Sequence, residues 1–90
     1  MNIDRRIIGY WTYGAFRTVS EYTFRDDGTF LYCNNSSGTI RRGTYTVSGN
    51  ILSLFNVDGV LYSRQEFSLN GDRLTFPLDE GDTITFNRNL

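Results

Sequence analysis

The sequence predicts an all-β fold: an eight-stranded antiparallel up-and-down barrel with short hairpin loops, formed by residues 1–90 as one domain. Two observations support this prediction. Apolar and polar residues alternate along short segments, as they do in strands with one buried face. Glycines that lie beside Asp, Asn or Ser separate these segments at intervals of ten to twelve residues, and such residues accept the positive φ angles of tight turns. These glycines are Gly28, Gly38, Gly49, Gly59, Gly71 and Gly81.

Each expected strand is an alternating segment bounded by turn residues. In chain order the strands cover residues 6–13, 18–25, 29–34, 39–47, 51–56, 60–69, 73–77 and 83–88. The connections between them are, in the same order, 14–18, 26–28, 34–38, 48–50, 56–59, 70–72 and 77–82. Since each connection joins neighbours in the sequence, the topology is a meander. Eight strands of this length can close into a barrel, which removes exposed edges.

Strand parity assigns one face of every strand to the interior, because side chains alternate along a strand. The inward positions are mostly large and apolar, whereas the alternate positions are mostly Thr, Ser, Arg and Glu. The expected core consists of Trp11, Tyr22, Phe24, Phe30, Tyr32, Tyr45, Val47, Leu52, Leu54, Phe67, Leu69, Leu74, Phe76, Ile84 and Phe86. With 16% aromatic residues, the chain supplies large side chains for a small interior.

Composition excludes several kinds of chemistry. The formal net charge is -1, so no basic surface is available to recruit nucleic acid. The chain has no histidine and no lysine, which excludes a histidine base, a histidine metal ligand and a lysine Schiff base. Cys33 is the only cysteine, so no internal disulfide can form. No cofactor or metal site is expected, and the acidic run at 79–82 is interpreted as a solvated turn.

Several short motifs resemble those of lipocalins and related calycin barrels. Gly9-Tyr10-Trp11 in the first strand is similar to the Gly-x-Trp signature of these barrels, and the hairpins over 22–30 and 43–52 resemble those of small bacterial lipocalin-like domains. The resemblance implies that Arg88 in the last strand packs across Trp11 and that Gly9, Trp11 and Arg88 have a structural role. The chain is far shorter than a full lipocalin, and its first connection is too short for a lid loop.

The two ends of the predicted barrel differ in chemistry. The tight turns at Gly28, Gly49 and Gly71 share one end with both termini, and large apolar residues should fill it. The longer connections mark the opposite, open end. There the inward positions become more polar, and the candidate ligand-binding residues are Tyr13, Ser20, Tyr32, Arg41, Ser63 and Gln65.

Arg41 is the main candidate among them. A guanidinium near the barrel mouth can pair with a carboxylate or phosphate of a ligand, with Tyr32, Ser63 and Gln65 adding hydrogen bonds. The alternative is that Arg41 extends over the rim into water or pairs with Asp79 or Glu80. The sequence leaves both alternatives open.

The outer face carries a second signal. Apolar residues occupy outward positions on consecutive strands from the third to the sixth, where they can form one patch that serves as a partner or homodimer surface. The candidate interface residues are Leu31, Ile40, Ile51, Phe55, Val60 and Tyr62. Scattered exposed apolar residues are the alternative. Cys33 lies beside Leu31 on the outward parity and is expected to be a small apolar residue of that face.

Two functions remain, and neither is enzymatic. The first is a non-catalytic binding module of the lipocalin-like type that binds a small amphipathic or anionic molecule at the open end. The second is a protein-interaction barrel, an inhibitor or an assembly or homodimer subunit, that uses the outer face or the open-end loops. No segment has the length of a membrane span. Residues 1–6 lack the apolar core of a signal peptide, so we expect a cytoplasmic protein, or a bacterial envelope protein if a signal was removed.

Overall fold

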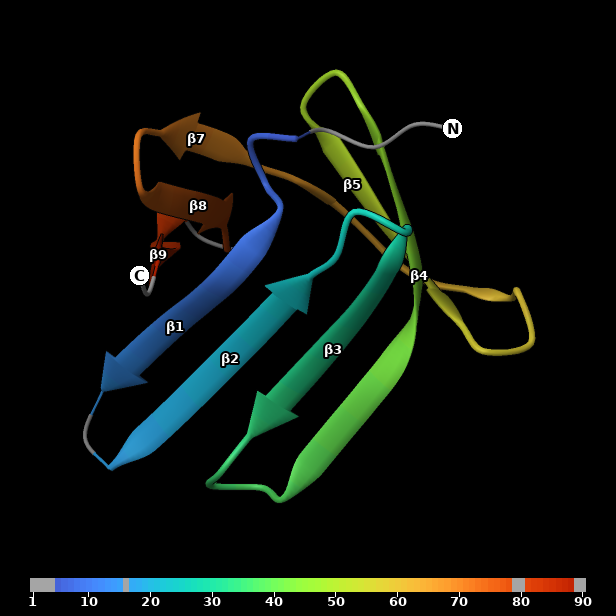
Figure 1. The fold of residues 1–90 in the computed structure, drawn as a ribbon. Coiled ribbons are helices and arrows are strands. Elements are labelled where there is room, and N and C mark those ends of the chain that lie inside the picture. Colours follow the sequence, from blue (N-terminus) through green and yellow to red (C-terminus); the bar gives the residue numbers. More distant parts are fainter. Residues whose placement is uncertain (1–4, 16, 79–80, 89–90) are drawn as a thin grey trace.

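The structure is a computed structural model that describes residues 5–15, 17–78 and 81–88, and in that part of the chain it contains nine β-strands and no α-helix. Figure 1 shows these strands as one strongly curved antiparallel sheet. The strands are β1 (Gly9–Ala15), β2 (Thr18–Phe24), β3 (Thr29–Asn34), β4 (Thr39–Ser48), β5 (Ile51–Asn56), β6 (Leu61–Glu66), β7 (Ser68–Asn70), β8 (Arg73–Pro77) and β9 (Thr83–Arg88).

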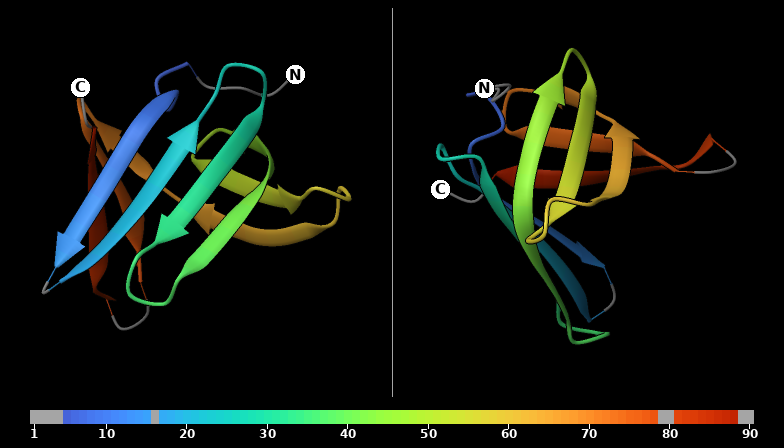
Figure 2. Two further views of the ribbon diagram at one scale, coloured as in Figure 1. Left: turned by 60° about the horizontal axis from the view of Figure 1, so that its bottom comes forward. Right: turned by 90° about the vertical axis from the view of Figure 1, so that its right-hand side faces the viewer.

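The order of strands in the sheet is β6-β5-β4-β3-β2-β1-β9-β8-β7. The two outermost strands, β6 and β7, are consecutive in the chain, so the sheet curls into a nearly closed barrel (Figure 2). The predicted antiparallel up-and-down barrel is therefore confirmed. The strand count differs by one, because the predicted strand 60–69 is divided at Phe67.

Phe67 explains this division. Before it, β6 pairs with β5, and after it, β7 pairs with β8. The Phe67 side chain is only 5% exposed, and its backbone N–H donates to the carbonyl oxygen of Asn50 at 2.9 Å. Burial of this ring thus marks the point where one continuous segment changes its partner and brings the two edges of the sheet together.

Every residue of the predicted inward set belongs to the hydrophobic core or packs against it. Parity therefore assigned these faces correctly. The sequence pattern missed Ile7, which precedes β1 and is completely buried. Its carbonyl oxygen accepts a 2.8 Å hydrogen bond from Nε1 of Trp11, so the segment before β1 covers the end of the core.

At the end of the barrel that carries the tight turns, Arg88 packs across Trp11, as the motif resemblance implied. Cζ of Arg88 lies 4.3 Å from the ring centroid of Trp11, and its Nε lies 3.0 Å from Oδ1 of Asp72. The same guanidinium donates to the carbonyl oxygens of Ile8 and Arg6. These contacts join the segment before β1, the turn before β8 and the last strand. The structural role predicted for Trp11 and Arg88 agrees with this geometry.

A close backbone approach occurs where β4 passes β5. A Cβ atom added at Gly43 would collide with the backbone carbonyl oxygen of Phe55. The φ angle of Gly43 is not positive, so glycine is required here for space and not for conformation. The residues that precede Gly43 in β4 lie toward the open end, and those that follow it lie over the core.

Candidate ligand-binding site

Three polar side chains from β2 and β3 meet on the inner face near the open end. Nδ2 of Asn34 donates to Oγ of Ser20 at 2.9 Å and to Oη of Tyr32 at 3.3 Å, and Tyr32 donates to Ser20 at 3.4 Å. Ser20 is only 6% exposed, so this small network lies against the core. The structure thus brings together the predicted site residues Ser20 and Tyr32, and it adds Asn34.

The sequence pattern assigned Asn34 only to a polar turn. Its Oδ1 does organise that turn, because it accepts hydrogen bonds from the backbone N–H groups of Ser36 and Ser37 at 2.9 and 3.1 Å. This leaves Nδ2 free to reach into the barrel. Strand parity could have shown that Asn34 faces inward, since it lies opposite Ser20 in the β2–β3 register and therefore shares its face.

Tyr22 lies at the centre of the inner face. Its ring centroid is 4.7 Å from that of Tyr32, 5.2 Å from that of Phe24 and 5.3 Å from that of Phe86. Burial raises its pKa above the usual tyrosine range, and the neighbouring tyrosines Tyr62 and Tyr32 raise it further. Among the described residues its hydroxyl has no hydrogen-bond partner, whereas no fully buried side-chain polar atom lacks one. The hydroxyl is therefore not fully buried.

Tyr62 does not lie where parity placed it. The prediction that it belongs to the outer face is wrong, because the register of β5 and β6 shifts: Leu54 pairs with Ser63 but Phe55 pairs with Leu61. Tyr62 is the extra residue of this β-bulge, and its ring stacks on that of Phe30 at 6.2 Å. Phe30 is a core residue, so the bulge turns Tyr62 toward the interior at the open end.

Arg41 lies beside Tyr62, with its Cζ 5.7 Å from the ring centroid. It is the cross-strand neighbour of Tyr32 and thus shares the inward face. Burial raises the pKa of Tyr62, while the Arg41 guanidinium acts in the opposite direction. Arg41 is exposed, and among the described residues no carboxylate lies within ion-pair distance of it. Asp79 and Glu80, the acidic partners considered for it, lie outside the described residues.

An open hollow of about 610 Å³ lies at the rim beside Arg41. It is lined by Ile40, Arg41, Arg42, Asn56, Val57 and Asp58. Two guanidinium groups and two exposed aliphatic side chains therefore face the same space, with one carboxylate. We call Ser20, Tyr22, Tyr32, Asn34, Arg41 and Tyr62 the open-end cluster. We call the hollow beside Arg41 the rim hollow, and it adjoins the open-end cluster.

The other predicted site residues are less closely associated with the cluster. The ring of Tyr13 lies 5.8 Å from that of Phe86, so it belongs to the same aromatic wall. Ser63 is half-buried and Gln65 is exposed. Among the described residues neither of them has a hydrogen bond to the open-end cluster. Their part in ligand binding stays a prediction.

The outer face is apolar in part. Ile40 and Val60 are 61% and 57% exposed, and Leu61, which parity did not include, is 42% exposed. Leu31, Ile51 and Phe55 are half-buried. Cys33 is a free, half-buried cysteine that pairs with Glu21 and Ile40 across the outer wall. The role of this face as an interface stays a prediction.

The fold and the open-end cluster define a small antiparallel β-barrel of the kind that serves as a binding module. The family described as lipocalin-like domain matches residues 7–76, and this chain belongs to it. The resemblance of the sequence motifs to small lipocalin-like barrels is thereby confirmed. The chain is also similar in fold to a protein from Bacteroides uniformis whose structure was determined by NMR, with 20% sequence identity and a TM-score of 0.70. That match covers 92% of this chain and 88% of the other.

Comparison with curated proteins finds no match. Within the described residues there is no helix of the length and apolar character needed to cross a membrane.

Proposed function

We propose that this domain is a non-catalytic binding module that takes a small anionic, amphipathic molecule at the open end of the barrel. This proposal rests on a single observation, which concerns the surroundings of the Arg41 guanidinium. Its guanidinium lies over Tyr62 beside an open hollow, and among the described residues it has no carboxylate partner. A carboxylate, sulfonate or phosphate group of a ligand supplies the missing partner through charge-assisted hydrogen bonds.

The aromatic residues supply the apolar half of the site. The ring of Tyr62 lies beside the Arg41 guanidinium, and Tyr32 is the cross-strand neighbour of Arg41. Tyr22 packs against Tyr32, and all three tyrosines are accessible in part. Deeper in the barrel, Trp11, Phe24 and Phe30 are at most 1% exposed, so the interior is filled with protein side chains. The proposed ligand therefore lies across the mouth of the barrel and does not enter a deep chamber.

A matched pair of ligands tests this proposal. Naphthalene-1-sulfonate carries a ring and an anion, whereas naphthalene-1-sulfonamide has nearly the same shape without the charge. We expect the sulfonate to shift the backbone NMR signals of Tyr32, Arg41 and Tyr62 and to bind more tightly than the sulfonamide. The Arg41→Gln variant should lose at least about tenfold in affinity for the sulfonate, since a hydrogen bond to a charged group contributes about 1.5–3 kcal/mol.

Arg64→Gln is the control for this variant. It removes the same charge from the outer wall of β6, away from the open-end cluster, and should leave the affinity unchanged. If the sulfonamide binds as well as the sulfonate, or if both variants bind equally, anion recognition by Arg41 is wrong. Signals that move only on the outer face contradict the location of the site.

The alternative is a protein-interaction barrel, and the exposed Ile40, Val60 and Leu61 favour it. If the outer face contacts a second copy, sedimentation equilibrium should give a mass above 10.4 kDa that falls when Ile40 and Val60 are replaced by serine. A monomer over the whole concentration range argues against the homodimer.

A further inference from the structure

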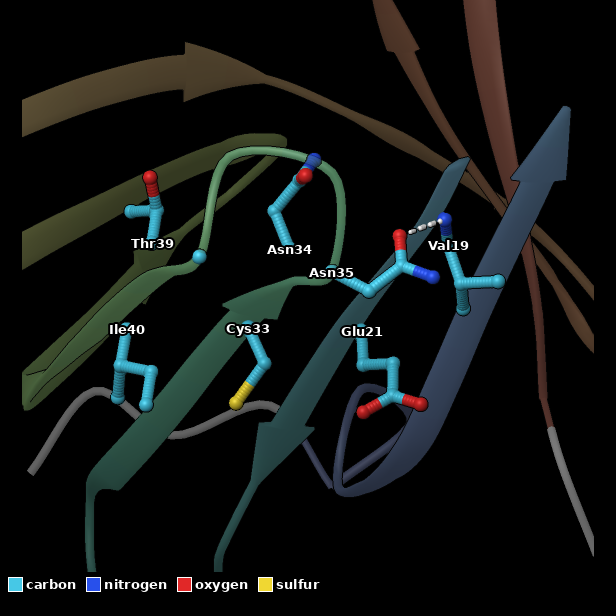
Figure 3. A pocket seen from close by; sticks show the side chains of 8 residues that line it. Val19, Glu21, Cys33, Asn34, Asn35, Thr39 and Ile40 are labelled. Carbon is cyan, nitrogen blue, oxygen red and sulfur yellow. Dashed lines mark hydrogen bonds between the residues drawn. The ribbon is translucent and has the colours of Figure 1, made fainter. Parts of the chain in front are cut away.

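A second hollow lies on the outer wall, across the strands β2, β3 and β4, and has a volume of about 410 Å³ (Figure 3). Glu21, Cys33 and Ile40 are cross-strand neighbours and form a row on its floor. The loop after β3 closes one end of it. Asn35 fixes this loop, because its Oδ1 accepts from the N–H of Val19 at 2.6 Å and its own N–H donates to the carbonyl oxygen of Val19 at 3.1 Å.

The walls of this hollow are aliphatic and accessible. Ile40 is 61% exposed and Val19 is 36% exposed, and Figure 3 shows both side chains on the same face of the sheet as the Glu21 carboxylate. A hollow of this volume falls within the range of small-molecule sites in proteins. An aliphatic chain that lies between Val19 and Ile40 would remove both side chains from water.

Glu21 carries the only charge among the residues that line the hollow. Its direct neighbours across the strands, Thr12 and Cys33, are uncharged. Among the described residues no arginine lies within ion-pair distance of its carboxylate. The carboxylate lies close enough to the Tyr10 hydroxyl to raise the pKa of Tyr10. Among the described residues, a half-buried carboxylate therefore remains without a cation.

We propose that this hollow binds a small organic cation, in which an ammonium group on a short aliphatic chain pairs with Glu21 while the chain packs between Val19 and Ile40. The charge, the apolar walls and the volume together specify this class of ligand. The site shares Asn34 with the open-end cluster and Ile40 with the rim hollow, but Glu21, Cys33 and Val19 belong to the outer wall, and the charge it selects has the opposite sign. It stands whether or not the open end binds an anion.

The test uses n-hexylammonium and the neutral n-hexanol, which has the same number of non-hydrogen atoms. We expect hexylammonium to shift the backbone NMR signals of Val19, Glu21, Cys33 and Ile40 in a saturable manner. Hexanol should bind about tenfold more weakly, as should hexylammonium with the Glu21→Gln variant. Glu66→Gln is the control, because it makes the same change on β6, outside this hollow, and should leave the affinity unchanged.

Cys33 provides a second readout, as the only thiol of the chain. Alkylation of Cys33 by iodoacetamide should slow by about tenfold at a hexylammonium concentration of ten times the dissociation constant. If Glu21→Gln fails to fold, Ile40→Thr replaces it, since this exposed side chain should lower affinity without affecting the core. Equal binding of hexanol and hexylammonium, or unchanged affinity in both variants, or signals that shift elsewhere, overturns the proposal.

Discussion

Replacing Gly9 by alanine tests the packing at the closed end of the barrel. The φ angle of Gly9 is +143°, a conformation that is almost restricted to glycine. A Cβ atom at this position would lie 2.6 Å from Nη1 of Arg88. The end of an arginine side chain can usually move aside. Here it stacks on Trp11 and bonds to Asp72 and to two backbone carbonyl oxygens, so moving it breaks these contacts.

The expected loss of stability in Gly9→Ala has two parts. Backbone strain at a conformation of this kind costs about 1–3 kcal/mol. Displacing the guanidinium from the Trp11 ring costs roughly 0.5–2 kcal/mol more. We therefore expect Gly9→Ala to lower the free energy of unfolding by about 2–4 kcal/mol. For a domain of this size, that corresponds to a urea midpoint lower by roughly 2 M, if the urea dependence is about 1–2 kcal/mol per molar.

Urea unfolding followed by fluorescence is the suitable assay, because Trp11 is the only tryptophan and lies in this contact. Gly49→Ala is the matched control. Gly49 also has a positive φ angle, +60°, but an added Cβ atom there would meet no atom within 4 Å. Gly49→Ala should therefore lower the free energy of unfolding only by the backbone strain of a left-handed residue, about 1–2 kcal/mol.

A double-mutant cycle with Arg88→Met separates the two parts. In that background the long guanidinium is absent, so the Gly9→Ala change should lose its steric component and keep only its strain. Two results would refute the reasoning: a cost at Gly9 no greater than that at Gly49, or the same cost at Gly9 with and without Arg88.

The remaining predictions concern β4 and the centre of the inner face. Gly43→Ala should lower stability by about 3 kcal/mol or more, since the carbonyl oxygen of Phe55 occupies the space of the new methyl group. Thermal unfolding checks this against Gly14→Ala, whose added Cβ atom would make only an ordinary contact at 3.9 Å. Burial raises the pKa of Tyr22 in the folded protein, so its contribution to stability is complete below a pH of about 10 and is lost as the pH rises toward the folded pKa. As the pH rises above about 10, the free energy of unfolding of Tyr22→Phe should therefore fall less than that of the unsubstituted protein. An equal fall in both proteins would contradict a raised pKa of Tyr22 in the folded state.

Parity succeeded where each strand kept one register along its whole length. Residues such as Phe24, Leu52 and Phe86 lie in regular antiparallel pairs, so the alternation of side chains in the sequence matches the two faces of the sheet. It failed at Tyr62, because a β-bulge adds one residue and reverses the face. A bulge depends on how β5 and β6 curve around the barrel, and the pattern of Leu61, Tyr62 and Ser63 does not reveal it.

The candidate site was predictable in part for the same reason. Ser20, Tyr32 and Arg41 occupy inward positions of regular strands, and the structure places them near one another. The hydrogen bond of Asn34 to Ser20 required the turn to direct its amide inward. The hollow around Glu21 was not predicted, since it depends on the packing of a loop against β2.

By itself, the sequence determined the class of fold, the turns and the inner face of the strands, because these follow from local rules: glycine at positive φ angles and a side-chain period of two. Only the tertiary structure decided how the sheet closes, where Phe67 changes partner, and how Arg88 joins segments more than seventy residues apart. It also decided which polar groups meet at the open end and on the outer wall. These features depend on sheet curvature and on long-range contacts, and neighbouring residues in the chain do not encode them.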